Sequence, residues 1–538
     1  MHLDRRSLVA WAGSTLAASS LPALAQSAQS APAPNPNVAP WHNIRHYGAS
    51  GDGSTIDSPA INRAIDAASA SGGGTVYFPA GIYASYSLRL KSNITLFLDQ
   101  GAVLLAAPTP HDGLPSASSF SAGYDPAEPQ GPWEPYQDYG HNHWHNSLIW
   151  GESLHDIAIL GQGLIWGKGL SRGWDHETAL PDSNKPGNGN KSIALKNCVN
   201  VTLRDFGILQ GGWFGLLATG VDNLTVDNLV IDTNRDGMDF DCCRNVRVSN
   251  CTVNSPWDDG ICPKSSCALG YPRVTENLTI TNCLVTGNYQ LGSVMDGSWK
   301  PFAPQEKAYR TGRIKCGTES NGGFKNITVS NCVFDHCHGF ELVSEDGAVC
   351  EDITITNLAM RGTVSAPIFL RLGSRMRGPA GAPVGSIRRI LFSNIVSSSA
   401  TLSPSLISGI PGHPIEDIKI SDVYLHQLGG GSADLAALNP PENESAYPEP
   451  EMFGQLPATG FFLRHVRNIE LSSVEIAVES PDARPAFGLL DVHGADFFRL
   501  RLPRSAPSFQ LHTVTDFRHF GSQFLPDFSS PSIDTHTL

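Results

Sequence analysis

A short repeated segment limits the fold of this chain more than any other feature. Clear copies begin at Asn200, Asn223, Asn245, Asn277 and Asn326, and each continues with alternating apolar and polar residues. The starts at 200, 223 and 245 differ by 23 and 22 residues, and later steps of 32 and 49 indicate insertions. Alternation gives each copy one buried and one solvated face. A single copy is too short to bury its own face, so neighbouring copies must stack.

These features predict an all-β fold, a single-stranded parallel β-helix with one coil for each copy. No helical pattern lies between copies, which argues against a TIM barrel or a doubly wound sheet. A β-propeller is the alternative, although its blades need about forty or more residues. Residues 58–71 have the apolar spacing of a short helix, with Ser58 as N-cap and Pro59 at the first position. We expect this helix to cover the first coil.

The chain of 538 residues is predicted to form one catalytic β-helix over residues 41–500, followed by a tail or cap over 501–538. An inserted region near 106–146 breaks the repeat and is rich in aromatic residues. It could wall a sugar cleft or pack on the scaffold. The formal charge of −14 offers no field that would attract nucleic acid. The sequence does not indicate an oligomeric state.

The first residues resemble an export signal. Arg5-Arg6 precede an apolar run, and small residues before Gln26 suit cleavage, so residues 1–25 are predicted to direct export and 26–40 to form a linker. The arginine pair is similar to a twin-arginine signal, and an ordinary secretory signal is the alternative. We expect a periplasmic or extracellular protein that does not cross a membrane, since no later segment has the length and apolarity of a span.

Eleven cysteines form an odd number, so at least one lacks a partner within the chain. Four of them follow an asparagine, at Cys198, Cys251, Cys283 and Cys332. A cysteine at one repeated position indicates a small buried residue in a ladder. No spacing matches a structural zinc site, while Cys242-Cys243 leaves bridges possible.

Three aspartates carry the predicted chemistry. Asp236 and Asp258 are 22 residues apart, which equals the local repeat, so they should stack on adjacent coils, with Asp259 beside them. Hydrolysis of a glycosidic bond needs one protonated carboxyl group and one carboxylate. Crowded carboxylates repel one another, which raises the pKa of one of them. The alternative is that these aspartates cap turns.

A basic pair follows downstream. Arg313 and Lys315 have one residue between them, so on a strand they would point the same way. Such a pair suits the carboxylate of a uronic acid, which arginine can bind with two hydrogen bonds. An exposed charged face is the alternative.

The chain resembles glycoside hydrolase family 28, the polygalacturonase family, from about Ile44 to about Asn394. The resemblance rests on Tyr47–Gly53, Gly72–Gly81, Leu88–Thr95, Asp258-Asp259 and Arg313-Ile314-Lys315. It implies a right-handed parallel β-helix, an inverting mechanism without a metal or other cofactor, and a pectic polysaccharide or oligogalacturonide as substrate. By the same resemblance Asp258 is the general acid, while Asp236 and Asp259 position and deprotonate water. The predicted substrate contacts are Arg313, Lys315, Asn234, Tyr289 and Lys264.

One departure from the family concerns a histidine. The family's Gly-His-Gly motif should fall between Asp259 and Arg313, but this chain has Gly287–Ser293 there, without histidine. His338-Gly339 comes too late in the chain for the role to be transferred. The departure favours exo action or a decorated pectin over ordinary endo-polygalacturonase activity.

Three rival interpretations remain. A pectate-type lyase would bind calcium through aspartates. Alternating histidines could hold a transition metal if they lay on a strand, although loop packing is favoured. A β-helix can also be a non-catalytic carbohydrate-binding surface. The residues concerned are Asp232, Asp236, Asp239 and Asp241 for calcium, and His141, His143 and His145 for a transition metal.

Overall fold

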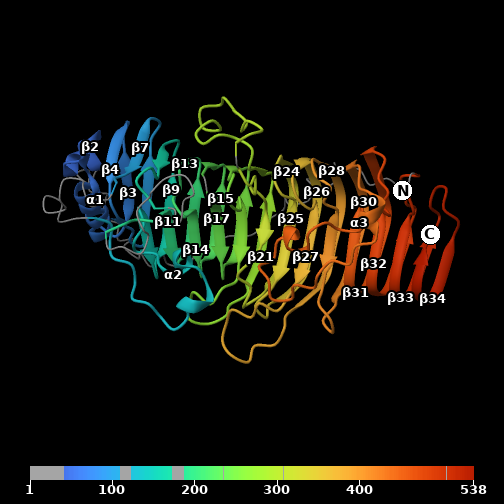
Figure 1. The fold of residues 1–538 in the computed structure, drawn as a ribbon. Coiled ribbons are helices and arrows are strands. Elements are labelled where there is room, and N and C mark those ends of the chain that lie inside the picture. The colour runs from blue at the N-terminus through green and yellow to red at the C-terminus, as the bar shows by residue number, and fades with distance from the viewer. Residues whose placement is uncertain (1–40, 109–122, 172–186, 234, 307, 505) are drawn as a thin grey trace, which may run out of the picture. The chain divides into compact units, whose positions relative to one another are not determined.

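The computed structural model describes residues 41–108, 123–171, 187–233, 235–306, 308–504 and 506–538. Figure 1 shows strands stacked one after another from the N-terminal to the C-terminal side of this part of the chain. The predicted export signal (1–25) and linker (26–40) lie outside the described residues. No helix in the described ranges is long and apolar enough to span a membrane.

The stack is a right-handed parallel β-helix, as predicted. One coil near the middle consists of β15 (Asp222–Asp227), β16 (Val230–Asp232) and β17 (Asp236–Asp241). Each of these strands pairs in parallel with the corresponding strand of the next coil, so the coils build three ladders. Alternate side chains point inward, and the inward apolar residues form one continuous core.

The three ladders give each coil the same order of strands. The first comprises β3 (Gly74–Phe78), β6 (Ile94–Leu98), β9 (His155–Leu160), β12 (Val199–Arg204), β15, β18 (Arg244–Ser249) and β21 (Thr275–Thr281). The second comprises β4 (Gly81–Ser85), β7 (Ala102–Ala106), β10 (Leu164–Trp166), β13 (Gly207–Leu209), β16, β19 (Thr252–Asn254) and β22 (Leu284–Thr286). The third comprises β5 (Leu88–Arg89), β8 (Ile149–Glu152), β11 (Lys191–Lys196), β14 (Phe214–Thr219), β17 and β20 (Ile261–Lys264).

Later coils have longer strands. From β24 to β30 a single strand pairs along both of the first two ladders, while shorter strands such as β25 follow the third. The still longer β31 pairs with both β29 and β30. These strands are β23 (Lys315–Cys316), β24 (Phe324–Asp335), β25 (Phe340–Ser344), β26 (Val349–Thr363), β27 (Ile368–Leu372), β28 (Ser386–Ser399), β29 (Ser405–Ser408), β30 (Ile415–Gly429), β31 (Phe461–Ser480), β32 (Phe487–Phe498), β33 (Phe509–Phe520) and β34 (Phe528–Thr537).

The repeated asparagines have a backbone role. Asn200 and Asn223 both have φ of 57°, a left-handed conformation that asparagine tolerates better than most residues. The Asn223 Nδ2 also donates to Asn200 Oδ1 at 2.7 Å, and Asn326 Nδ2 donates to Asn277 Oδ1 at 2.7 Å. The repeat is therefore maintained along the chain by turn geometry and by amide bonds between coils.

Replacing Asn223 with alanine is expected to lower the free energy of unfolding by about 1–2 kcal/mol, because alanine in a left-handed conformation costs about that much. Replacing Asn223 with glycine, which adopts this conformation without strain, should cost less. Urea unfolding of both variants measures the difference. Equal losses would show that the lost amide bond, and not the backbone conformation, sets the effect.

The N-terminal end is covered as predicted by a helix, α1 (Ser58–Ala70), whose residues Ile61 and Ile65 are fully buried. The predicted cap is displaced by one residue. Asp57 is the N-cap, and its carboxylate accepts from the backbone of Ser50 and Gly51 instead of capping the helix.

The predicted boundary at residue 500 is wrong. β33 pairs in parallel with β32 and adds a further coil, and β34 then pairs with β33 in antiparallel fashion. Phe509, Leu511 and Val514 of this strand are fully buried. The strand lacks the asparagine-led segment, which is why the repeat did not reveal it.

The insertion packs on the outside of the third ladder. The insertion is described at residues 106–108 and 123–146, and the longer part includes η3 (Glu134–Tyr136) and α2 (Tyr139–Asn142). Trp144 is 2% exposed and belongs to a cluster with Trp213, Phe214 and Leu217. This part of the insertion therefore packs on the scaffold, while residues 109–122 lie outside the described chain.

All eleven cysteines are buried free thiols, so no disulfide bridges this chain. Cys251, Cys283 and Cys332 follow left-handed asparagines on successive coils. The ladder predicted from the repeated position is present, and Cys242 and Cys243 form no bridge.

Candidate active site

Three aspartates meet where strands of the third ladder begin. Asp236 is the first residue of β17, and Asp258-Asp259 are separated from the start of β20 by Gly260 alone. Register pairs Met238 with Ile261, an offset of 23 residues. Asp259, and not Asp258 as predicted, is therefore level with Asp236. Carboxylate oxygens of all three nevertheless lie within 4.8 Å of one another.

The surroundings shift the pKa values of two of these aspartates in opposite directions. Burial raises the pKa of Asp236 well above its usual range, and the charges of Asp258 and Asp239 add to the effect. Burial also acts on Asp258, but the Arg235 guanidinium and a hydrogen bond with Asp236 outweigh it and lower the pKa. The Arg235 Nε lies 3.1 Å from Asp258 Oδ2. Asp236 is therefore the more readily protonated of the two, whereas the resemblance assigned the acid role to Asp258.

Arg313 is enclosed by carboxyl groups. Its side chain is 2% exposed, and Nε donates to Asp259 Oδ1 at 2.7 Å. Nη1 lies 2.6 Å from Glu341 Oε2. Nη1 and Nη2 donate to the two oxygens of Glu449 at 2.8 and 2.6 Å. The His338 Nδ1 lies 3.1 Å from Nη1.

Lys315 lies in the same enclosure, with a side chain 1% exposed. Its Nζ is 3.2 Å from Glu341 Oε1 and 3.4 Å from Glu449 Oε1. The pair thus points the same way, as strand spacing predicted, and the alternative of an exposed charged face is wrong. The carboxylates that contact Arg313 and Lys315 here are side chains of the protein itself.

A second charged group adjoins the aspartates. Lys264 is 5% exposed, and its Nζ lies 3.6 Å from Asp239 and 3.3 Å from Glu319. His141, from α2, reaches the same carboxylates at 3.8 and 3.7 Å. Burial lowers the pKa of His141 below its usual value. The insertion therefore contributes a buried imidazole next to the aspartates, which its sequence did not reveal.

Four further residues of the site were not predicted: Arg235, Glu341, Glu449 and His338. Glu341 could have been found by register, because it pairs with Lys315 on the adjacent coil. Glu449 lies 136 residues beyond Arg313 in a segment without repeat pattern. No spacing argument would bring these two together.

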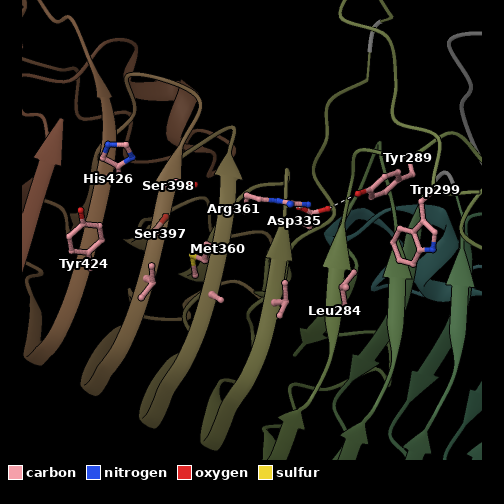
Figure 2. Close-up of a pocket in the computed structure, with 13 residues that line it drawn as sticks. Leu284, Tyr289, Trp299, Asp335, Met360, Arg361, Ser397, Ser398, Tyr424 and His426 are labelled. Carbon is pink, nitrogen blue, oxygen red and sulfur yellow. Dashed lines mark hydrogen bonds and ion pairs between the residues drawn. The ribbon is translucent and has the colours of Figure 1, made fainter. Parts of the chain in front are cut away.

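Tyr289, a predicted substrate contact, does not lie with the three aspartates. It lines a groove of about 780 Å³, together with Trp299 and Tyr424, and its hydroxyl donates to Asp335 Oδ2 at 2.7 Å. Figure 2 shows this groove on the outer surface of the long strands, with Arg361 on the other side of Asp335. None of the three aspartates lines it. Asn234, also a predicted substrate contact, is outside the described residues.

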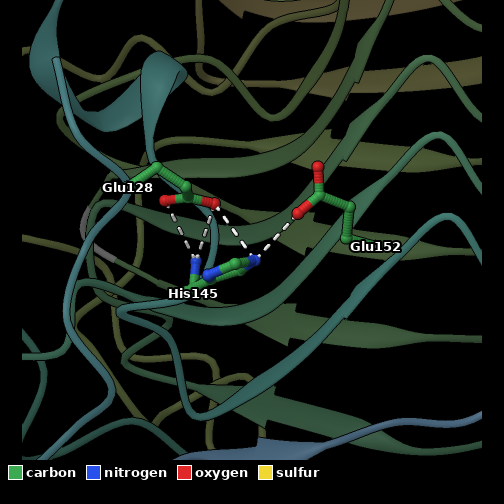
Figure 3. Close-up of side chains that lie close together, drawn as sticks. All are labelled: Glu128, His145 and Glu152. Atoms are coloured by element: carbon green, nitrogen blue, oxygen red, sulfur yellow. Dashed lines mark hydrogen bonds and ion pairs between the residues drawn. The ribbon is translucent and has the colours of Figure 1, made fainter.

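The alternating histidines do not converge. His141 faces Asp239 and Glu319, while His143 lies between Glu128 and Glu134. His145 lies 2.9 Å from Glu152 and 3.5 Å from Glu128 (Figure 3). These last three residues are close enough to share an ion. Their carboxylates already have partners, because backbone amides donate to Glu128 and Lys196 lies 3.1 Å from Glu152.

The aspartates considered for calcium are also divided. Asp232 accepts from the Asn254 amide and from the backbone of Gly292. Asp241 accepts from the backbone and the hydroxyl of Ser266. Lys264 already supplies positive charge beside Asp239. The four predicted ligands therefore do not form one oxygen cage.

Two family profiles match parts of the chain. Residues 41–109 match a family described as "Rhamnogalacturonase A/epimerase, pectate lyase-like". Residues 178–300 match one described as "Right handed beta helix region". Together they cover the capped first coils and the coils that carry Asp236, Asp258 and Asp259.

Two relatives are similar to this chain over longer stretches. A probable polygalacturonase of Vitis vinifera is 24% identical over 71% of this chain and 73% of its own length. An exo-poly-alpha-D-galacturonosidase of Dickeya chrysanthemi is 27% identical over 41% of each chain. The chain thus spans about two fifths of the length of the second relative.

Two solved structures share the fold. An exopolygalacturonase from Thermotoga maritima superposes with a TM-score of 0.55 at 18% identity, over 72% of this chain and 87% of its own. A family 28 exopolygalacturonase from Yersinia enterocolitica also has a TM-score of 0.55, at 17% identity, over 87% and 78% of the two chains. At these identities the likeness concerns the arrangement of the coils.

Proposed function

We propose that this chain, a polygalacturonase-like protein of glycoside hydrolase family 28, hydrolyses galacturonosyl linkages in pectic polysaccharides. The observation that carries the proposal is the meeting of Asp236, Asp258 and Asp259, in which one carboxyl group is held protonated and another ionised. Acid and base are thereby available in one buried cluster.

Hydrolysis requires that one proton is donated to the glycosidic oxygen and that one proton is removed from water. A carboxyl group protonates the glycosidic oxygen as the bond to the anomeric carbon breaks, and water adds to that carbon and loses its proton to a carboxylate. Asp236 and Asp258 are hydrogen-bonded, so we assign the donated proton to this pair. Asp259, bound to Arg313 at 2.7 Å, assists in accepting the proton of water.

The test is product analysis by mass spectrometry after incubation with polygalacturonate and, separately, rhamnogalacturonan, each with a chelator. Saturated products carrying one added water would support hydrolysis, and the better substrate would identify the linkage. Unsaturated products would instead support a lyase. No product from either polymer would contradict the proposal and favour the binding-surface alternative.

The stereochemistry of the product is a separate prediction. We expect inversion at the anomeric carbon, as the family resemblance implies. Inverting pairs usually stand about 6.5–9.5 Å apart, whereas oxygens of the three aspartates here lie within 4.8 Å. Proton NMR of the first-formed anomer decides, because a retained configuration would require a covalent intermediate on one aspartate.

The dependence of KM on pH follows from Glu341. Burial raises the pKa of this carboxyl group to about 8, against the lowering effect of Arg313 and Lys315. The neutral acid is present below that pH, and a negative charge appears beside the two cations above it. KM for an acidic substrate should therefore rise as pH passes about 8. Glu341→Gln should abolish this rise, and a rise that persists would contradict the assignment.

Exo action is our second, finer proposal. The names of the Dickeya, Thermotoga and Yersinia proteins support it, since each is an exo-acting enzyme by name. The absence of histidine between Asp259 and Arg313 also departs from the endo pattern. Monomers or short oligomers of one size, formed from the start of digestion of polygalacturonate, would support exo action, whereas a falling series of sizes would contradict it.

We further propose that the protein is exported to the periplasm or the medium. Support comes from the paired arginines and the apolar run within residues 1–25. Cell fractionation followed by N-terminal sequencing tests this proposal. Recovery in the cytoplasm with the first residues intact would contradict it.

A further inference from the structure

One carboxylate at the buried cations comes from a distant segment. Glu449 lies between β30 and β31, and both of its oxygens accept from Arg313, at 2.8 and 2.6 Å. Lys315 Nζ is a further 3.4 Å neighbour. This is the forked geometry in which a guanidinium binds any carboxylate, including that of a uronic acid.

Glu449 differs from the other carboxyl groups around Arg313. The side chains of Asp259 and Glu341 are 5% and 1% exposed, whereas that of Glu449 is 28% exposed. Arg313 itself is 2% exposed. Glu449 is thus the partner that faces solvent, from which a ligand would arrive.

The charges of Arg313 and Lys315 are balanced when one solvent-facing carboxylate, such as that of Glu449, is present. Burial raises the pKa of Glu341 to about 8, so this residue is neutral near pH 7. The carboxylates of Asp259 and Glu449 then offset Arg313 and Lys315. Without Glu449 one positive charge would be uncompensated, which leaves room for one external carboxylate.

The backbone that carries Glu449 is firmly held. Buried Arg371 donates to the carbonyl groups of Glu442 and Asn443 at 3.0 and 3.1 Å, and Arg464 donates to that of Pro440 at 2.8 Å. These bonds fix the start of the segment, and Glu449 itself is the N-cap of η4 (Pro450–Phe453), whose Phe453 is buried. Rotation about the side-chain bonds of Glu449 would therefore release Arg313 while the segment stays in place.

We propose that Glu449 is an internal substitute for the carboxylate of the substrate. It binds Arg313 and Lys315 in the free protein, and a galacturonate residue displaces it on binding. The inference rests on the proposed function in taking a uronic acid as the ligand. A neutral sugar has no group that can replace Glu449, so the exchange selects for acidic sugars.

Titration calorimetry with D-galacturonate tests the exchange, with D-galactose as the neutral control. Glu449→Gln removes the competing charge and should bind galacturonate at least about tenfold more tightly, because the site no longer has to be vacated first. Binding of galactose should be unchanged. The matched control is Glu451→Gln, two residues on, whose carboxylate accepts from Ser365 at 2.7 Å. It should behave like the parent protein.

Galacturonate binding to Glu449→Gln that is no tighter than to the parent, with an unchanged melting temperature, would overturn the proposal. If the variant does not fold, Glu449→Asp gives a second test, because its shorter side chain should weaken the competition and tighten binding by a smaller factor. Turnover of polygalacturonate by the parent protein is a separate test of the proposed function. Turnover without tightening would overturn only the exchange, and tightening without turnover would support the exchange in a non-hydrolytic protein.

Discussion

Replacing Asp258 with asparagine is expected to reduce kcat on polygalacturonate by at least about a thousandfold, because a positioned acid or base contributes about that much. The fold should persist. The substitution removes the ion pair with Arg235, but the amide oxygen of asparagine can still accept a hydrogen bond from protonated Asp236. We expect the melting temperature to change by less than about 5 °C. Steady-state kinetics and calorimetry measure both quantities.

The control is Asp66→Asn, an exposed aspartate on α1, which should leave kcat unchanged. Undiminished turnover in the Asp258 variant would contradict its role. An aryl galacturonide with a good leaving group distinguishes the two possible proton donors, since it needs little protonation. Its rate should be spared in Asp258→Asn if Asp258 gives the proton, and in Asp236→Asn if Asp236 does.

Replacing Arg313 with alanine is expected to lower the free energy of unfolding by about 3–5 kcal/mol, because buried carboxyl groups lose their shared partner. Asp259, Glu341 and Glu449 all contact this guanidinium within 2.8 Å. The value of kcat/KM on acidic substrates should also fall, since both Asp259 and the proposed uronate position depend on Arg313. Urea unfolding and kinetics at several substrate concentrations provide the two measurements.

The control for this variant is Arg467→Ala, which removes an ion pair with Glu416 whose arginine side chain is 59% exposed. Exposed pairs contribute only about 0–1 kcal/mol. A loss of similar size in both variants would show that burial of Arg313 has no special effect. An equal effect of Arg313→Ala on neutral and acidic glycosides would contradict the uronate interpretation.

Much of the fold follows from periodicity alone. Alternation and the spacing of Asn200, Asn223 and Asn245 predicted stacked coils, because the same backbone turn recurs wherever a left-handed asparagine is needed. The meeting of Asp236 with Asp258 and Asp259 followed from the same repeat, apart from a shift of one residue in register. These are consequences of geometry that is local or regular.

Contacts made by irregular segments could not be predicted in this way. His141 reaches Asp239 from an insertion, and Glu449 reaches Arg313 from a segment without repeats. Their positions depend on how those segments fold back over the third ladder. The sequence likewise does not reveal charge balance, since the effect of burial on Asp236, Asp258 and Glu341 depends on neighbours from several coils.

The buried cysteines bear on the order of events after synthesis. In the folded chain every thiol is enclosed, and Cys251, Cys283 and Cys332 recur on successive coils. An unfolded chain would present all eleven to oxidants at once, and any bridge between distant coils would block their stacking. The chain must therefore finish coiling before it meets oxidising conditions, and a refolding protocol without reductant should yield mostly misbridged protein.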